Sequence, residues 1–304
     1  MYEIIIVGGG PAGMAAAVYA ARKRLNTLLI SGDIGGQVNW TTGVENYLGY
    51  QLIQGADLIT KFQQQVNQFP IDRKIGLKVS QIKKIDGGFE VISESGEIYQ
   101  GKVVLLATGK RPRRLNVAGE IELTGRGVTY CAICDGPVFA GQKVAVIGGG
   151  NSAIEAALDM VKIAEHVDIV SVTPLTGDPI MIEKLSDAKN LTIYTEYQTE
   201  KVLGNGLVEG IIIKNLKTGQ SKQLDVTGVF IEIGLEPNSG MVKDLLKLNQ
   251  NGEVPVNCSS ETEIPGLYAA GDVTTVPEKQ IIIAAGEGAK AALQAHRYLQ
   301  RLAN

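Results

Sequence analysis

Residues 2–13 read YEIIIVGGGPAG, an apolar run that passes directly into a glycine-rich turn. The run Tyr2–Val7 has the composition of a strand that is buried on both faces. An alanine-rich helix is predicted from Met14 to Arg24, and a second strand from Asn26 to Ile30. Strand, GxGxxG turn, helix and strand in this order are the signature of a dinucleotide-binding fold.

The glycines of this turn have different tasks. Gly8 permits the tight bend, Gly10 lets the backbone approach a pyrophosphate, and Gly13 lets the helix pack on the strand. The N-terminus of the helix then faces the phosphates. The residues predicted to contact a nucleotide here are Gly8, Gly10, Pro11, Ala12 and Gly13. The acidic side chain that usually binds the ribose at the end of the second strand is missing, because Ser31 stands there.

A second unit of the same kind follows in the middle of the chain. A strand is predicted at Lys143–Ile147, a helix from the following turn to Met160, and a further strand at Val167–Val170. The turn reads GGGNSA, and its predicted nucleotide contacts are Gly148, Gly150, Asn151, Ser152 and Ala153. Two such units are more specific than one, and they predict an α/β chain with two nucleotide-binding folds, one following the other or inserted in it.

Two of the three cysteines lie between these units, in the sequence CAICD at 131–135. Closing so small a loop removes little chain entropy, so a disulfide here is predicted to be chemical rather than structural. A zinc site would need more ligands, and the rest of the chain offers one cysteine and two histidines in no metal-binding pattern. We therefore interpret Cys131 and Cys134 as a redox dithiol and predict no metal.

The composition sets further bounds. The chain has 304 residues, 44% of them hydrophobic, which is enough for two globular domains. Its net charge of −3 argues against bulk binding of nucleic acid. No apolar run is long enough to span a membrane and no signal peptide is predicted, so the few cysteines indicate a reducing cytoplasm. Cys258 is expected to be a buried small apolar residue, and His296 a surface or interface residue.

Several other motifs complete a family pattern. They are GGGPAG at 8–13, GGQ at 35–37, ENY at 45–47, ATG at 107–109, CAICDG at 131–136, GGGNSA at 148–153, GD at 271–272 and KQIIIAAGEGAKAAL at 279–293. With them, essentially the whole chain resembles the low-molecular-weight thioredoxin reductases, and also the reductase part of the alkyl hydroperoxide reductase flavoprotein subunit. The last motif is more similar to the second group.

This resemblance implies two Rossmann-like three-layer dinucleotide-binding domains, the second inserted into the first. The FAD-binding domain would comprise residues 1–112 and 240–304, and the NAD(P)-binding-like domain with the CxxC motif residues 113–239. Besides the first glycine turn, the resemblance implies FAD contacts at Gly36, Gln37, Thr42, Asn46, Ala107, Thr108, Gly109, Gly271, Asp272, Lys279, Gln280 and Ile281. A homodimer is also implied.

The resemblance further implies a mechanism. Cys134 would lie against the flavin ring, and Cys131 would attack the disulfide of thioredoxin or a thioredoxin-like protein. Asp135 would be the general acid that protonates the departing thiolate, a role that requires burial to raise the pKa of its carboxyl group. Because the flavin motif begins at residue 8, we expect no thioredoxin-like domain before it and expect electrons to pass to a separate protein.

The chain departs from the family pattern at the second nucleotide site. Family members that use NADPH carry a basic cluster after the strand that ends near Val170, where the side chains bind the 2′-phosphate. Here no Lys or Arg occurs from Val167 to Ile182, and Ser171 occupies the position where an NADH enzyme usually has a carboxylate. Three readings stay open: a relaxed NAD(P)H site, an NADH site selected by other residues, or a relic in a ferredoxin-linked enzyme. The basic segment 110–114 is expected to be a solvated hinge, or else a docking patch for an acidic partner such as ferredoxin.

Two other functions compete with a disulfide reductase of the thioredoxin or peroxiredoxin system. A flavin NAD(P)H oxidase would need no CxxC motif, so the cysteine pair counts against it. A redox-sensing module that binds nucleotide without turnover is disfavoured by the intact set of Cys131, Cys134 and Asp135.

Overall fold

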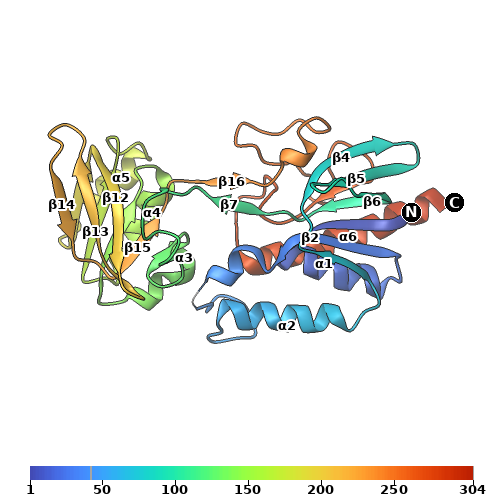
Figure 1. Cartoon of the computed structure of the whole chain (residues 1–304), viewed down its shortest axis with the longest axis horizontal. Helices are drawn as coiled ribbons and strands as arrows, with labels where there is room; N and C mark the ends of the chain where they lie inside the picture. Colours follow the sequence, from blue (N-terminus) through green and yellow to red (C-terminus); the bar gives the residue numbers. More distant parts are fainter. Residues whose placement is uncertain (42, 304) are drawn as a thin grey trace.

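The computed structural model describes residues 1–41 and 43–303. Thr42, one of the expected flavin contacts, lies outside the described residues. The chain forms two α/β units joined by a narrow pair of strands (Figure 1). Within residues 1–41 and 43–303, no helix combines the length and the apolar character needed to cross a lipid bilayer.

The first unit is built on a sheet of seven strands centred on β1 (Tyr2–Gly9). The sheet has the order β3-β2-β1-β6-β5-β4, and β17 also pairs with β6. The pairs formed by β3, β2, β1, β6 and β17 are parallel, whereas β5 is antiparallel to both of its neighbours, β6 and β4. The remaining strands are β2 (Thr27–Ile34), β3 (Asp72–Ile75), β4 (Val79–Ile85), β5 (Gly88–Ser93), β6 (Ile98–Leu106) and β17 (Leu267–Ala269). The helices are α1 (Pro11–Arg22), η1 (Gly36–Trp40), α2 (Gly55–Asn67), η3 (Gly240–Val242) and α6 (Ile281–Ala303).

Alternate residues of β1 point into two separate cores. Ile4 and Ile6 pack with side chains of α1, α2 and α6, which cover one face of the sheet (Figure 1). Ile5 and Val7 pack on the other face, with residues of β4, β5 and the loops after η3. Burial on both faces explains why this strand is a continuous apolar run instead of an alternating one.

The second unit is a parallel sheet in the order β11-β10-β9-β15-β8. Two helices cover one face, and a three-stranded antiparallel sheet covers the other, so the unit has three layers. Its strands are β8 (Val128–Thr129), β9 (Lys143–Ile147), β10 (His166–Ser171), β11 (Leu191–Thr195), β12 (Tyr197–Gly204), β13 (Val208–Asn215), β14 (Ser221–Leu224) and β15 (Gly228–Ile231). Its helices are α3 (Ala132–Asp135), η2 (Gly136–Phe139), α4 (Asn151–Met160) and α5 (Pro179–Ser186).

Two short antiparallel strands connect the units, β7 (Lys110–Pro112) and β16 (Leu235–Pro237) (Figure 1). The first unit takes strands from both ends of the chain, and the second unit lies entirely between β7 and β16. The expected fold class, two Rossmann-like folds with the second inserted into the first, is confirmed. The expectation of a wholly solvated hinge is wrong at Lys110, whose side chain is 9% exposed because it is paired with Glu253.

Candidate active site

The two cysteines of the CxxC motif form a disulfide in the structure, with their Cα atoms 5.3 Å apart. Cys131 precedes the single turn of α3, and its sulfur accepts a hydrogen bond from the backbone N–H of Cys134 at 3.2 Å. Both cysteines line a cavity of about 580 Å³ at the junction of the two units. The disulfide therefore faces an internal space in which a second redox group could lie.

Asp135 is almost completely buried, with 3% of its surface exposed. Its carboxylate accepts a hydrogen bond from the hydroxyl of Thr129, and the same Thr129 oxygen accepts the backbone N–H of Cys131 at 3.2 Å. Thr129 thus links the carboxyl group to the dithiol loop. Asp135 also lines the cavity with the cysteines, so a buried carboxyl group and the disulfide share this space.

Most of the predicted flavin contacts meet around this cavity. Those that line it are Gly8, Gly10, Pro11, Ala12, Gly36, Gln37, Ala107, Thr108, Gly109, Gly271, Asp272, Lys279, Gln280 and Ile281. Gly13 and Asn46 do not line it. Asn46 contacts a residue of the lining instead, since its amide donates to the side chain of Gln280 at 3.1 Å.

The first glycine turn has the shape that a dinucleotide requires. A Cβ atom on Gly8, where φ is +117°, would lie 2.2 Å from the carbonyl oxygen of Ala107, and one on Gly13 would lie 1.8 Å from that of Gly8. These two glycines are needed for close packing. A Cβ on Gly10 would meet nothing within 4 Å, so the backbone is open there toward the cavity. The residues present therefore fit a bound dinucleotide.

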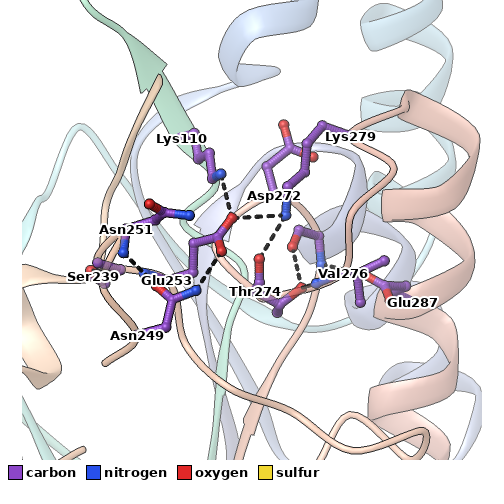
Figure 2. Close-up of polar contacts among 12 residues, drawn as sticks. Lys110, Ser239, Asn249, Asn251, Glu253, Asp272, Thr274, Val276, Lys279 and Glu287 are labelled. Carbon is purple, nitrogen blue, oxygen red and sulfur yellow. Dashed lines mark hydrogen bonds and ion pairs between the residues drawn. The ribbon is translucent and has the colours of Figure 1, made fainter. Parts of the chain in front are cut away.

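Polar residues from distant parts of the chain also line or border this cavity. Gln37 donates to the carboxylate of Asp272 at 3.3 Å, and burial raises the pKa of Asp272 above its usual value. Figure 2 shows Lys110 and Lys279 on either side of Glu253, with Nζ to Oε1 distances of 2.6 and 3.5 Å. The Lys279 ammonium also donates to the carbonyl of Thr274 at 2.6 Å. Two basic groups and two carboxylates are thus fixed beside the cavity.

A second cavity of about 1150 Å³ lies in the inserted unit, at the carboxyl end of its parallel sheet. Gly148, Gly150 and Ser152 line it, and so does Ser171 at the end of β10. Two predicted contacts do not line it: Asn151, whose side chain accepts the backbone N–H of Asp178 at 2.7 Å, and Ala153, which is fully buried. The basic side chains on this cavity are those of Arg111, Arg113 and Arg114, which come from the connecting segment.

Glu232 joins this second cavity to the dithiol. It lines the cavity, and its Oε1 atom accepts the backbone N–H of Ala132, inside the CxxC motif, at 3.3 Å. Burial raises the pKa of its carboxyl group to about 7; the backbone hydrogen bond from Ala132 opposes this rise and the negative charge of Glu155 adds to it.

Sequence reasoning missed Thr129, Glu232 and Glu253. A detectable signal exists only for Glu232, which directly follows the apolar run Val229-Phe230-Ile231, at the end of a strand where ligands bind. The expectation for Cys258 is wrong, because this thiol is exposed. It lies in a surface turn in which the side chain of Asn257 accepts the backbone N–H groups of Ser259 and Glu261.

Among residues 1–41 and 43–303, no group of three or more His, Cys, Asp and Glu side chains is placed so as to hold a metal ion.

Two dinucleotide-binding units, with a disulfide that lines the cavity at their junction, are the architecture of a nucleotide-dependent disulfide oxidoreductase. The chain belongs to the pyridine nucleotide-disulphide oxidoreductase family, whose model matches residues 2–290. It is an enzyme of this class, and membership implies FAD together with a nucleotide cofactor.

Its relatives fall into two groups. The chain is 41% identical over 301 residues to the F component of the alkyl hydroperoxide reductase of Staphylococcus aureus, covering 99% of this chain but 59% of that protein. Among solved structures, a thioredoxin reductase from Streptococcus pyogenes is 37% identical with a TM-score of 0.93 and covers 99% of each chain. A thioredoxin reductase from Lactococcus lactis, described as in the FR conformation, is 33% identical, covers 99% of this chain and 100% of its own, and has a TM-score of 0.69.

Proposed function

We propose that the chain is an FAD-dependent disulfide reductase that passes electrons through Cys131 and Cys134 to thioredoxin or a thioredoxin-like protein. One observation carries this proposal: the disulfide lines the same cavity as the first glycine turn and the Gly271-Asp272 segment. A redox disulfide is useful at that position if the cavity holds the group that reduces it. The predicted FAD contacts, on residues 1–112 and 240–304, supply the binding site.

The residues of the dithiol loop then have separate tasks. FAD held by the predicted contacts would, once reduced, supply the electron pair that reduces the Cys131–Cys134 disulfide to two thiols. The Cys131 thiolate attacks one sulfur of the partner's disulfide, and the other sulfur leaves as a thiolate, which receives a proton from Asp135. The Cys134 thiolate then attacks Cys131, which releases the reduced partner and restores the internal disulfide. Thr129 positions Asp135 throughout, because it holds both the carboxylate and the loop.

We propose NAD(P)H as the electron donor, bound in the second cavity within residues 113–239. Gly148 supports this assignment, because a Cβ atom there would lie 2.3 Å from the carbonyl of Glu232, while one on Gly150 would meet nothing within 4 Å. The first glycine turn combines close packing and an open backbone in the same way. The ferredoxin alternative is less favoured, since Lys110 is paired with Glu253, and Arg111 with Glu236 at 3.0 Å.

The donor proposal requires a movement of the two units. Among the described residues, the linings of the two cavities share only Arg111. A nicotinamide in the second cavity is therefore separated from a flavin in the first. Rotation about the β7–β16 pair would bring them together. The Lactococcus lactis relative supports such a rotation, because it matches the whole chain and yet superposes with a TM-score of only 0.69.

The acceptor is proposed from the relatives. The thioredoxin reductase neighbours favour a thioredoxin-like protein. The alkyl hydroperoxide reductase relatives favour the peroxiredoxin system as a second candidate. We also propose a homodimer, on the family resemblance, and a cytoplasmic location, on the scarcity of cysteine.

Two assays test this function. Anaerobic addition of NADPH, NADH or reduced ferredoxin, with flavin absorbance as the readout, identifies the donor. Bleaching by two equivalents of NADPH or NADH, enough to reduce both the disulfide and FAD, is expected, and bleaching by ferredoxin alone contradicts the donor proposal. Steady-state reduction of a thioredoxin-like protein is expected for the wild type and absent for Cys134→Ser, although that variant still binds FAD. Turnover retained in Cys134→Ser would refute the dithiol role.

A further inference from the structure

Glu232 occupies a rigid position between the two redox sites. It directly follows β15, and its backbone N–H donates to the carbonyl of Ile147 at the end of β9 with a distance of 2.8 Å. Its own carbonyl lies against Gly148, the first glycine of the second turn. The backbone of Glu232 is thus fixed by the sheet and by the nucleotide turn together.

The sheet order shows which half of a dinucleotide would meet Glu232. The strand β9 lies between β10 and β15, so the chain order reverses there, and ligands bind in the crevice at such a point. The adenosine half lies over the second strand of the unit, which is β10 and ends at Ser171. The nicotinamide half must then extend over β15, where Glu232, Ile233 and Gly234 line the cavity.

The other contact of Glu232 is with the dithiol loop. Its Oε1 atom accepts the N–H of Ala132, the residue next to Cys131. The same side chain therefore contacts the dithiol loop and lines the second cavity, so it connects the two although the two cavities are separate. Among the hydrogen bonds described for the Glu232 side chain, the one from Ala132 uses Oε1 and none uses Oε2. A ligand can therefore donate to Oε2 without displacing a described bond.

The charges around Glu232 come from three directions. Glu155 on α4 repels the carboxylate, and Arg113, Arg114 and Glu236 line the same cavity from the connecting segments. Asp135 lies three residues beyond Ala132, on the far side of the disulfide motif. Burial raises the pKa of Glu232 to about 7, so its charge changes within the physiological range.

We propose that Glu232 is a positioning residue shared by the two redox sites, with one carboxyl oxygen holding the dithiol loop and the other binding the nicotinamide half of the dinucleotide. The nicotinamide half offers amide N–H and ribose O–H donors, which a carboxylate accepts. The inference rests on the proposed function, because it requires NAD(P)H in the second cavity. Through Glu232, binding of a dinucleotide in this cavity would affect the dithiol loop.

The test compares nucleotides that do and do not carry the nicotinamide half. Calorimetric titration of the oxidised holoenzyme with NAD⁺, NADP⁺ and ADP gives their Kd values for the wild type, Glu232→Ala and Glu232→Gln. In Glu232→Ala we expect affinity for the dinucleotides to fall about tenfold or more, the loss of one hydrogen bond to a charged group. Affinity for ADP should stay unchanged, and Glu232→Gln, which keeps an acceptor oxygen, should recover most of the dinucleotide affinity.

A second readout follows the dithiol. In the reduced enzyme, the pH dependence of Cys131 alkylation by iodoacetamide gives the pKa of its thiol. A nearby carboxylate raises the pKa of a thiol, so both Glu232 variants should lower it. The matched control is Glu155→Gln, which removes a negative charge that acts on the Glu232 carboxyl group but belongs to a residue outside the cavity lining. It should leave the ratio of NAD⁺ to ADP affinity unchanged.

The outcomes separate the inference from the function on which it rests. If Glu232→Ala loses affinity for NAD⁺ and for ADP equally, or loses none, the proposed role of Glu232 is wrong. The donor proposal stays intact in that case, provided that the wild type binds a dinucleotide. An unchanged thiol pKa in both variants also overturns it. If the wild type binds neither NAD⁺ nor NADP⁺, the donor proposal and this inference fail together.

Discussion

The ammonium group of Lys110 lies 2.6 Å from the carboxylate of Glu253, and the two side chains are only 9% and 12% exposed. Lys110 begins the connecting strand β7, whereas Glu253 belongs to the first unit. Asn249 donates to the same carboxylate at 2.7 Å (Figure 2). This pair therefore fixes the start of the connection between the units to the first unit, at a residue that lines the first cavity.

Removing one member of the pair should destabilise the protein. A mostly buried ion pair that loses one partner leaves an uncompensated charge, which costs about 3 kcal/mol. We expect Glu253→Gln to lower the free energy of unfolding of the FAD-free protein, measured by urea denaturation, by an amount of this order. The double variant Lys110→Met/Glu253→Gln should recover part of the loss. If Glu253→Gln unfolds at the same urea concentration as the wild type, the pair does not fix the connection.

The effect of Glu253→Gln should depend on pH. Burial alone would raise the pKa of Glu253, but the hydrogen bonds from Lys110 and Asn249 and the charges of Lys110 and Lys279 outweigh it and lower the pKa. A depressed pKa stabilises the fold above the unfolded-state value, about 4.3, and this stabilisation is lost as the pH falls through the folded-state pKa. The difference between variant and wild type should be full at neutral pH and shrink in acid. A difference that grows below about pH 4 contradicts the sign.

Asp135→Asn should slow the transfer of electrons to the partner. An amide cannot give the departing thiolate a proton, and loss of a general acid costs about a hundredfold or more. The rate to measure is reoxidation of the reduced enzyme by the partner's disulfide. Thr129→Val keeps the carboxyl group but loses its hydrogen bond, so we expect a smaller loss, about tenfold. Unchanged reoxidation in Asp135→Asn excludes its role as the acid.

Two glycine substitutions should separate folding from flavin binding. In Gly10→Val the new Cβ meets no atom within 4 Å, and φ is negative, −79°, so the protein should fold. The valine side chain should occupy the space above the glycine turn and lower the flavin content. Gly13→Ala places a Cβ 1.8 Å from the carbonyl oxygen of Gly8, so the first unit should be destabilised even without FAD. The ratio of flavin to protein absorbance and the far-UV dichroism of the apoprotein distinguish the two effects. Full flavin content in Gly10→Val would show that the phosphates do not bind at this turn.

The sequence predicts the frame of the molecule well, because both nucleotide folds are local patterns. Strand, glycine turn and helix are contiguous at 2–22 and again at 143–160, and the steric need for Gly8 and Gly148 can be inferred from the motif alone. The dithiol is equally local. These features require no knowledge of distant contacts.

Contacts between distant segments could not be predicted. Glu253 meets Lys110 across 143 residues, and Glu232 reaches Ala132 across 100. Neither pair has a spacing that signals contact, since the sheet order and the connection between the units decide which residues meet. Cys258 was expected in the core because cysteine is usually buried, but the turn made by Asn257 places it at the surface.

Reductive titration tests the central claim most directly, because it counts the electron pairs that the enzyme stores. Dithionite is added anaerobically to the FAD-loaded wild type and to Cys134→Ser, and flavin absorbance and free thiols are followed together. If FAD and the Cys131–Cys134 disulfide form one redox chain, the wild type accepts two electron pairs per protomer. One pair reduces the flavin and the other reduces the disulfide, which is seen as free thiols. Cys134→Ser accepts only one pair. One pair in both proteins, with the wild-type disulfide still intact, would contradict it.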